Sequence, residues 1–191
     1  MASFTLQIKH IFFGNILLII CCAFYLIWWL LAFRPEKPVG GTGWLLIPAF
    51  IAGLVSILLI THSISRVGGT GSLIPSRVIL LGGPIAFVVL LVVTVLIFKR
   101  PVTTELFLIV GWATMILSEV NALYRTNMFS RNTAAWLMAV ILVAAVISLV
   151  CYVLYYRLDA RLSYYDGTVP LLMVACVTAV ISVCMAVHSI K

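Results

Sequence analysis

The feature that most limits the fold is a series of six apolar stretches, each about 20 residues long or longer. A helix needs about 20 mainly apolar residues to cross the hydrocarbon core of a bilayer, because each residue adds about 1.5 Å of length. The sequence therefore predicts an integral membrane protein. The six predicted spans are residues 11–33, 43–64, 78–98, 106–125, 133–156 and 169–188.

Composition and loop length define the architecture around these spans. Apolar residues make up 64% of the chain and charged residues 9%, whereas ordinary globular domains have about 45–50% and 25%. The connections are short, so consecutive helices must be antiparallel neighbours. We predict an all-α membrane protein, a compact bundle of six antiparallel transmembrane helices in a single domain over residues 1–191. Six spans put both termini on one side, which we call the near side; the opposite side is the far side.

The charged residues in the loops indicate how the protein is oriented in the membrane and which partners it can bind. Lysine and arginine divide equally between the two sides, whereas the acids outside the spans all lie on the far side. This asymmetry favours a cytoplasmic N-terminus for a multi-pass protein. The net charge of +7 is spread over the loops without a cluster of four basic residues. Such a distribution indicates contact with membrane lipid and argues against a nucleic-acid partner.

Glu119 is the only acid well inside a predicted span. Inserting such a side chain costs about 2.5–3.5 kcal/mol, so it normally faces other helices or a water-filled cavity and marks a functional site. We predict that Glu119 is a proton or cation site. The alternative is a structural role, in which a protonated or hydrogen-bonded Glu119 only holds the bundle together. Supporting polar groups are expected from Asn15, Ser118, Asn121 and His62.

The span that contains Glu119 also has a polar stripe. Thr114, Ser118, Asn121 and Arg125 recur at helical spacing and therefore share one face. Glu119 points about 100° away from Ser118 around the helix axis. The partner of Glu119 must therefore come from another helix. The candidates are Asn15, His10, His62 and His188.

Most tryptophan and tyrosine side chains lie toward the far side. These residues form belts at membrane interfaces, because their rings are apolar and their tips are polar. A belt alone should occupy both interfaces, whereas this distribution is one-sided. Aromatic faces beside carboxylates also suit an organic cation. The predicted ligand-binding aromatic residues are Trp28, Trp29, Trp112 and Tyr152.

The three histidines all fall on the near side, at the ends of different spans. Neutral imidazoles with a carboxylate suit the binding of zinc or iron, or a proton relay. The chain has no pair of histidines at i, i+4 on one helix, and capping of a helix C-terminus explains such positions equally well. We favour no metal and no cofactor. The alternative metal ligands are His10, His62 and His188.

Two main functional hypotheses remain open. The first is a small transporter or membrane-embedded binding protein for a hydrophobic small molecule, organic cations included, which predicts a polar cavity reaching Glu119 and a loosened helix at Gly82–Pro84. The second is a membrane enzyme acting on a lipid or prenyl-like substrate, which predicts that the three histidines converge. An accessory subunit that packs against a larger partner is a third alternative. We lean toward the non-enzymatic hypothesis and leave open a homo-oligomer or a larger membrane complex.

Overall fold

The computed structural model describes residues 5–69, 71–98, 104–155 and 157–190; most of these residues are helical and none of them forms a strand. Six helices are long and apolar enough to cross a membrane. The predicted fold class, a bundle of six antiparallel transmembrane helices, is therefore confirmed. The helices are α1 (Leu6–Ala32), α2 (Leu46–Arg66), α3 (Ser76–Phe98), α4 (Thr104–Arg125), α5 (Arg131–Tyr155) and α7 (Val169–Ile190).

Two short helices lie at the far side. The 3-10 helix η1 (Thr42–Leu45) leads into α2, and α6 (Ala160–Asp166) precedes α7. Helix α1 begins at Leu6, five residues before the predicted start, because a helix can continue beyond the apolar segment into the polar interface. Tyr156, the last residue of the predicted fifth span, lies outside the described residues.

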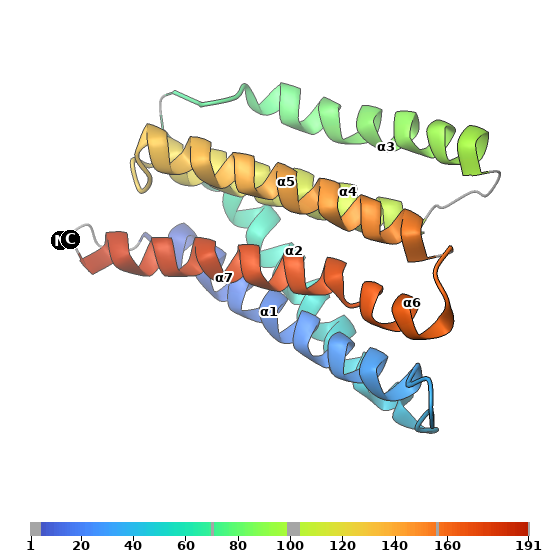
Figure 1. The fold of residues 1–191 in the computed structure, drawn as a ribbon. Coiled ribbons are helices and arrows are strands. Elements are labelled where there is room, and N and C mark those ends of the chain that lie inside the picture. The colour runs from blue at the N-terminus through green and yellow to red at the C-terminus, as the bar shows by residue number, and fades with distance from the viewer. Residues whose placement is uncertain (1–4, 70, 99–103, 156, 191) are drawn as a thin grey trace.

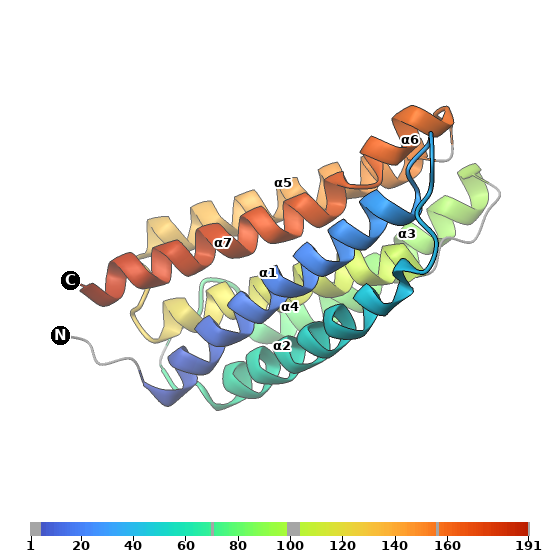
Figure 2. The same ribbon diagram turned by 90° about the horizontal axis from the view of Figure 1, so that it is seen from below.

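The helices run roughly side by side, and the start of α1 lies at the same end of the bundle as the end of α7 (Figures 1 and 2). Helix α1 packs against α2 and α7, and α5 packs against α4 and α7. Helix α3 lies at the edge of the bundle, beside α4 (Figure 1). This order places α4 between the edge helix and the rest of the bundle.

Helix α4 is the most deeply packed of the six. In its apolar segment 56% of the residues are buried, compared with 11% in α3. One face of α4 contributes Ile116, Val120 and Leu123 to the core, all fully buried. Side chains from α1, α5 and α7 complete this core, among them Ile11, Leu137, Ile141, Ile181 and Met185.

Glycines allow two close helix contacts. A Cβ at Gly14 of α1 would overlap with Ile60 of α2, and a Cβ at Gly83 of α3 would overlap with Thr114 of α4. Small residues allow transmembrane helices to approach closely and so to gain van der Waals contact. Helix α3 is assigned as one helix through Gly82–Pro84. The loosening expected there stays a prediction, whereas the docking role of Gly83 is visible in the packing.

Candidate functional site

The side chain of Glu119 lies in the interior of the bundle and is paired with an amide. Asn15 Nδ2 of α1 donates to Glu119 Oε1 of α4 at 2.6 Å, and both side chains are 0% exposed. The same Nδ2 lies 3.9 Å from Met185 Sδ of α7. Of the four partners considered for Glu119, the structure thus selects Asn15, and the pair connects α1 with α4.

This pair leaves polar atoms without partners. Glu119 Oε2, Asn15 Oδ1 and the indole Nε1 of Trp112 are all buried, and none has a hydrogen-bond partner among the described residues. Trp112 lies seven residues before Glu119, which is two turns of helix, so the two share a face. Buried polar atoms without a protein partner normally indicate a proton, water or ion that completes their bonding. The surroundings of Glu119 therefore suit a proton site.

The polar stripe of α4 points to a different part of the bundle. Ser118 Oγ donates to the carbonyl oxygen of Thr114 at 2.8 Å, and Thr114 Oγ1 donates to that of Val110 at 2.8 Å. Hydroxyls in such bonds keep acceptor capacity for a ligand. Ser118 therefore does not support Glu119 directly, although it is its neighbour in sequence.

Asn121 fixes the loop before α3. Its Oδ1 accepts from the backbone N–H groups of Leu73 at 3.0 Å and Ile74 at 3.4 Å, and its Nδ2 donates to the carbonyl oxygen of Ile74 at 2.9 Å. The same loop crosses the end of α4 at Gly69, where φ is 138° and a Cβ would overlap with the backbone of Arg125. The sequence grouped Asn121 with Glu119, whereas the structure uses it to position α3 against α4.

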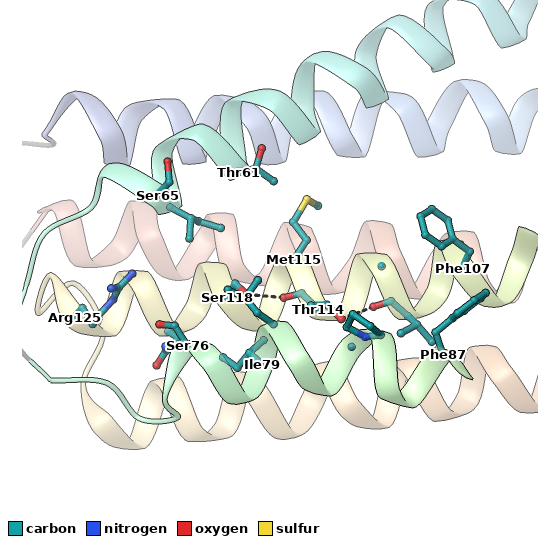
Figure 3. Close-up of a pocket in the computed structure, with 17 residues that line it drawn as sticks. Thr61, Ser65, Ser76, Ile79, Phe87, Phe107, Thr114, Met115, Ser118 and Arg125 are labelled. Carbon is teal, nitrogen blue, oxygen red and sulfur yellow. Dashed lines mark hydrogen bonds between the residues drawn. The ribbon is translucent and has the colours of Figure 1, made fainter. Parts of the chain in front are cut away.

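A cavity of about 710 Å³ lies between α2, α3 and α4 (Figure 3). Helix α4 supplies its floor, with Thr114, Met115 and Ser118 near the middle. The cavity is open on its outer side, because two of its lining residues, Leu80 and Phe107, are 62% and 63% exposed. In a spanning bundle this opening faces the hydrocarbon of the bilayer.

The two ends of the cavity differ in chemistry. Six polar residues lie toward the near side: Thr61, Ser65, Ser76, Ser118, Asn121 and Arg125. Arg125 is half-buried, and its Nε is buried without a hydrogen-bond partner among the described residues. At the other end the rings of Phe87 and Phe107 meet edge to face with centroids 5.9 Å apart. The cavity is therefore polar at the near interface and apolar toward the far side.

Glu119 does not line this cavity. Met115 and Ser118 of α4 do line it, whereas Glu119 is fully buried and its side chain points about 100° away from Ser118 around the helix axis. The expected polar cavity reaching Glu119 is not what the described residues form. The sequence signal that could have located the cavity was the polar stripe of α4 together with Gly83, but nothing in the sequence showed which helices stand opposite the stripe.

The four predicted ligand-binding aromatic residues do not form a common pocket. Trp29 Nε1 donates to the carbonyl oxygen of Tyr164 at 3.1 Å, and these two residues line a second cavity of about 310 Å³ at the far end. Trp28 packs edge to face with Tyr25. Trp112 is buried in the core, and Tyr152 packs against that core. Of the four, Trp29 lines one of these two cavities, and the other three line neither.

The histidines take up positions typical of helix ends. His188 Nδ1 lies 2.8 Å from the carbonyl oxygen of Cys184 and its ring packs against Phe129, whereas His62 is exposed. His10 is half-buried in the second turn of α1. In the part of the chain that the structure describes, no three histidine, cysteine or carboxylate side chains are grouped so as to hold a metal ion. The alternative of a zinc or iron site stays a prediction without support from this geometry.

Comparison with protein-family models, with curated proteins and with solved structures found no match for this chain. The fold and the site thus define an integral, multi-pass membrane protein with six helices long and apolar enough to cross a membrane, a buried carboxyl group on one face of α4 and an open cavity on another.

Proposed function

We propose that the protein is a membrane-embedded binding protein or small transporter for hydrophobic small molecules, with the cavity between α2, α3 and α4 as the ligand site. The observation that carries the proposal is the cavity itself, which has about 710 Å³ and three helical walls. Pockets for small ligands typically have about 300–1,000 Å³ and a mainly apolar lining with a few polar groups. Its outer opening would admit a ligand directly from the bilayer.

Glu119 enters the proposal as a proton site that is coupled to the cavity through α4. Its neighbour Ser118 lies on the cavity floor, while its carboxyl group contacts α1 through Asn15. A change of protonation at Glu119 alters the bond between α1 and α4, and so acts on the helix that carries the cavity floor. The described residues that line the cavity include no acid. The proposed ligand therefore need not be a cation.

The test is photolabelling of the full-length protein in phosphatidylcholine nanodiscs with a hydrophobic alkyl diazirine. The labelled residues should concentrate on the facing sides of α2, α3 and α4. Gly111 lines the cavity with open space around the position of a Cβ, and Gly82 has open space but does not line it. Gly111→Phe should therefore remove saturable labelling, and the matched variant Gly82→Phe should keep it.

The proton site is tested with the same probe at acidic and alkaline pH. The extent of labelling should vary with pH in the parent protein and in Glu105→Gln, an exposed control on the same helix, but not in Glu119→Gln. Labelling that is evenly spread over all lipid-facing helices would contradict the ligand site and favour the accessory-subunit alternative. A pH response that survives in Glu119→Gln would remove Glu119 from the proposal.

A further inference from the structure

The cavity is polar at its near end and apolar at its far end, and this difference limits the class of ligand that it can bind. This step rests on the proposed function, because it assumes that the cavity is the ligand site. Its near end contains the hydroxyls of Ser65 and Ser76 and the guanidinium group of Arg125, and its far end is lined by Phe87 and Phe107 (Figure 3). A ligand that matches both ends must be an amphiphile with a polar head at the near interface.

The positive charge at the near end of the cavity favours a ligand with an anionic headgroup. Arg125 carries the only charge among the described lining residues, and its Nε lies buried with no hydrogen-bond partner in the part of the chain that the structure describes. Acids outside the spans occur only on the far side of the chain, and Glu119 already bonds Asn15. A buried guanidinium N–H without a protein acceptor is well suited to a phosphate or carboxylate oxygen.

The start of α3 adds to this positive potential. Ser76 is the first residue of a helix of 23 residues and lines the same end of the cavity as Arg125. A helix N-terminus presents unpaired backbone N–H groups and the positive end of the helix dipole. Asn121 holds the loop before Ser76 in place through Leu73 and Ile74. The helix N-terminus and the guanidinium group thus lie next to one cavity.

The length of the cavity fits a headgroup and one acyl chain. On α3 the lining runs from Ser76 to Phe87, a rise of about 16.5 Å, and on α4 it runs from Arg125 to Phe107, a rise of about 27 Å, at about 1.5 Å per residue. Half of a hydrocarbon core of about 30 Å is about 15 Å. A tail that starts at the level of Ser76 would therefore reach the ring of Phe87, and the longer extent along α4 leaves room for the headgroup at Arg125.

We infer that the cavity binds an anionic phospholipid of the near leaflet, with the headgroup phosphate at Arg125 and one acyl chain along α3 and α4 toward Phe87. The lipid enters sideways through the opening between α2 and α3. Pro84 and Gly111 line the apolar part of its path. Bulk lipid contact alone would engage Arg125 no differently from other interfacial arginines, and the experiment uses that difference.

The test is native mass spectrometry of the full-length protein titrated with palmitoyl-oleoyl phosphatidylglycerol and with phosphatidylcholine of the same acyl chains. A Lys or Arg at a membrane surface contributes about a 5-fold preference for anionic lipid. The first lipid bound should therefore be phosphatidylglycerol by about 5-fold, and Arg125→Gln should remove that preference. Arg125→Lys, which keeps the charge, should retain most of it.

Two matched variants separate this inference from the proposed function. Arg131→Gln removes an exposed arginine at the near end of α5 that does not line the cavity, and it should leave the preference unchanged. Gly111→Phe should weaken the binding of both lipids, whereas Gly82→Phe should not. Equal losses in Arg125→Gln and Arg131→Gln, or no lipid preference in the parent protein, would overturn the inference.

The failures of the two proposals are distinguishable. If Gly111→Phe removes the diazirine label while Arg125→Gln leaves phosphatidylglycerol binding intact, the anionic headgroup is wrong and the hydrophobic ligand site stands. If Gly111→Phe changes neither the label nor the lipid binding, the cavity is not a ligand site and both proposals fail.

Discussion

Two faces of α4 carry polar side chains, but the side chains on each face bond different partners. One face places Glu119 against Asn15 of α1, where both side chains are fully buried and a bond of 2.6 Å spans two helices. The other face places Ser118 and Thr114 at an open cavity, where their hydroxyls bond the backbone of their own helix. The polar side chain on the closed face needs a hydrogen-bond partner from a neighbouring helix. The hydroxyls on the open face bond the backbone of their own helix and remain accessible to a ligand.

The largest expected effect comes from removing a side chain on the closed face. Glu119→Ala deletes a buried side chain and leaves Asn15 Nδ2 without its acceptor, so we expect a loss of about 2–4 kcal/mol in the free energy of unfolding. Ser118→Ala, one residue away on the open face, should change it by less than about 0.5 kcal/mol. Reversible unfolding in mixed detergent and dodecyl sulfate micelles measures both. Equal losses in the two variants would remove the distinction between the faces.

A second prediction concerns how α3 is held against the open face. Gly83→Ala adds a methyl group that would overlap with the branched, stiff side chain of Thr114. Overpacking of this kind costs about 1–3 kcal/mol. Gly82→Ala adds the same group in open space and should be neutral or slightly stabilising, because alanine favours helix over glycine. Thermal unfolding in detergent should therefore show a lower midpoint for Gly83→Ala only.

A third prediction concerns the loop that joins α2 to α3. Asn121→Ala removes three hydrogen bonds to Leu73 and Ile74, which we expect to lower the stability of this loop by about 1–2 kcal/mol. The measurement is amide hydrogen exchange at Leu73 and Ile74, which should become faster while exchange in the buried part of α5 stays unchanged. If exchange at both amides is unchanged, the hydrogen bonds from Asn121 are not needed to keep this loop in place.

The sequence was enough to predict the six spans, because the thickness of the bilayer fixes their length and hydropathy does not depend on how the helices are arranged. It also placed Glu119 and Asn15 at similar depth, since depth follows from the position of a residue along its helix. Which of the four candidate residues bonds Glu119 depends on how the other helices are arranged around α4, and the sequence does not show that arrangement. The predicted polar groups Asn121 and His62 share that depth range, but Asn121 bonds Leu73 and Ile74, and His62 is exposed.

The cavity was not predictable from the sequence for a related reason. The surfaces of a transmembrane helix that face lipid and those that face another helix are both apolar, so hydropathy does not show which helices are neighbours. The stripe from Thr114 to Arg125 indicated a polar face, but only the positions of α2 and α3 turn that face into a cavity floor. The aromatic residues were misleading in the same way, because Trp112 shares the far half of the bilayer with Trp29 and is nevertheless buried in the core.

The smallest expected effect is the coupling between Asn15 and Glu119, and it separates two explanations for the cost of Glu119→Ala. A double-mutant cycle with Asn15→Ala and Glu119→Ala measures their interaction apart from the loss of packing. Side-chain hydrogen bonds between membrane helices average about 0.6 kcal/mol in such cycles, with a maximum of about 1.7 kcal/mol. We expect a value in this range, and no coupling in the control cycle of Asn15→Ala with Ser118→Ala. A coupling near zero for the first cycle would show that the loss of stability is due to the vacated volume alone, and that the pair does not transmit a change at Glu119 to α1. A coupling well above this range would show that the bond to Asn15 dominates the closed face, so that any change in the protonation of Glu119 must act on the position of α1.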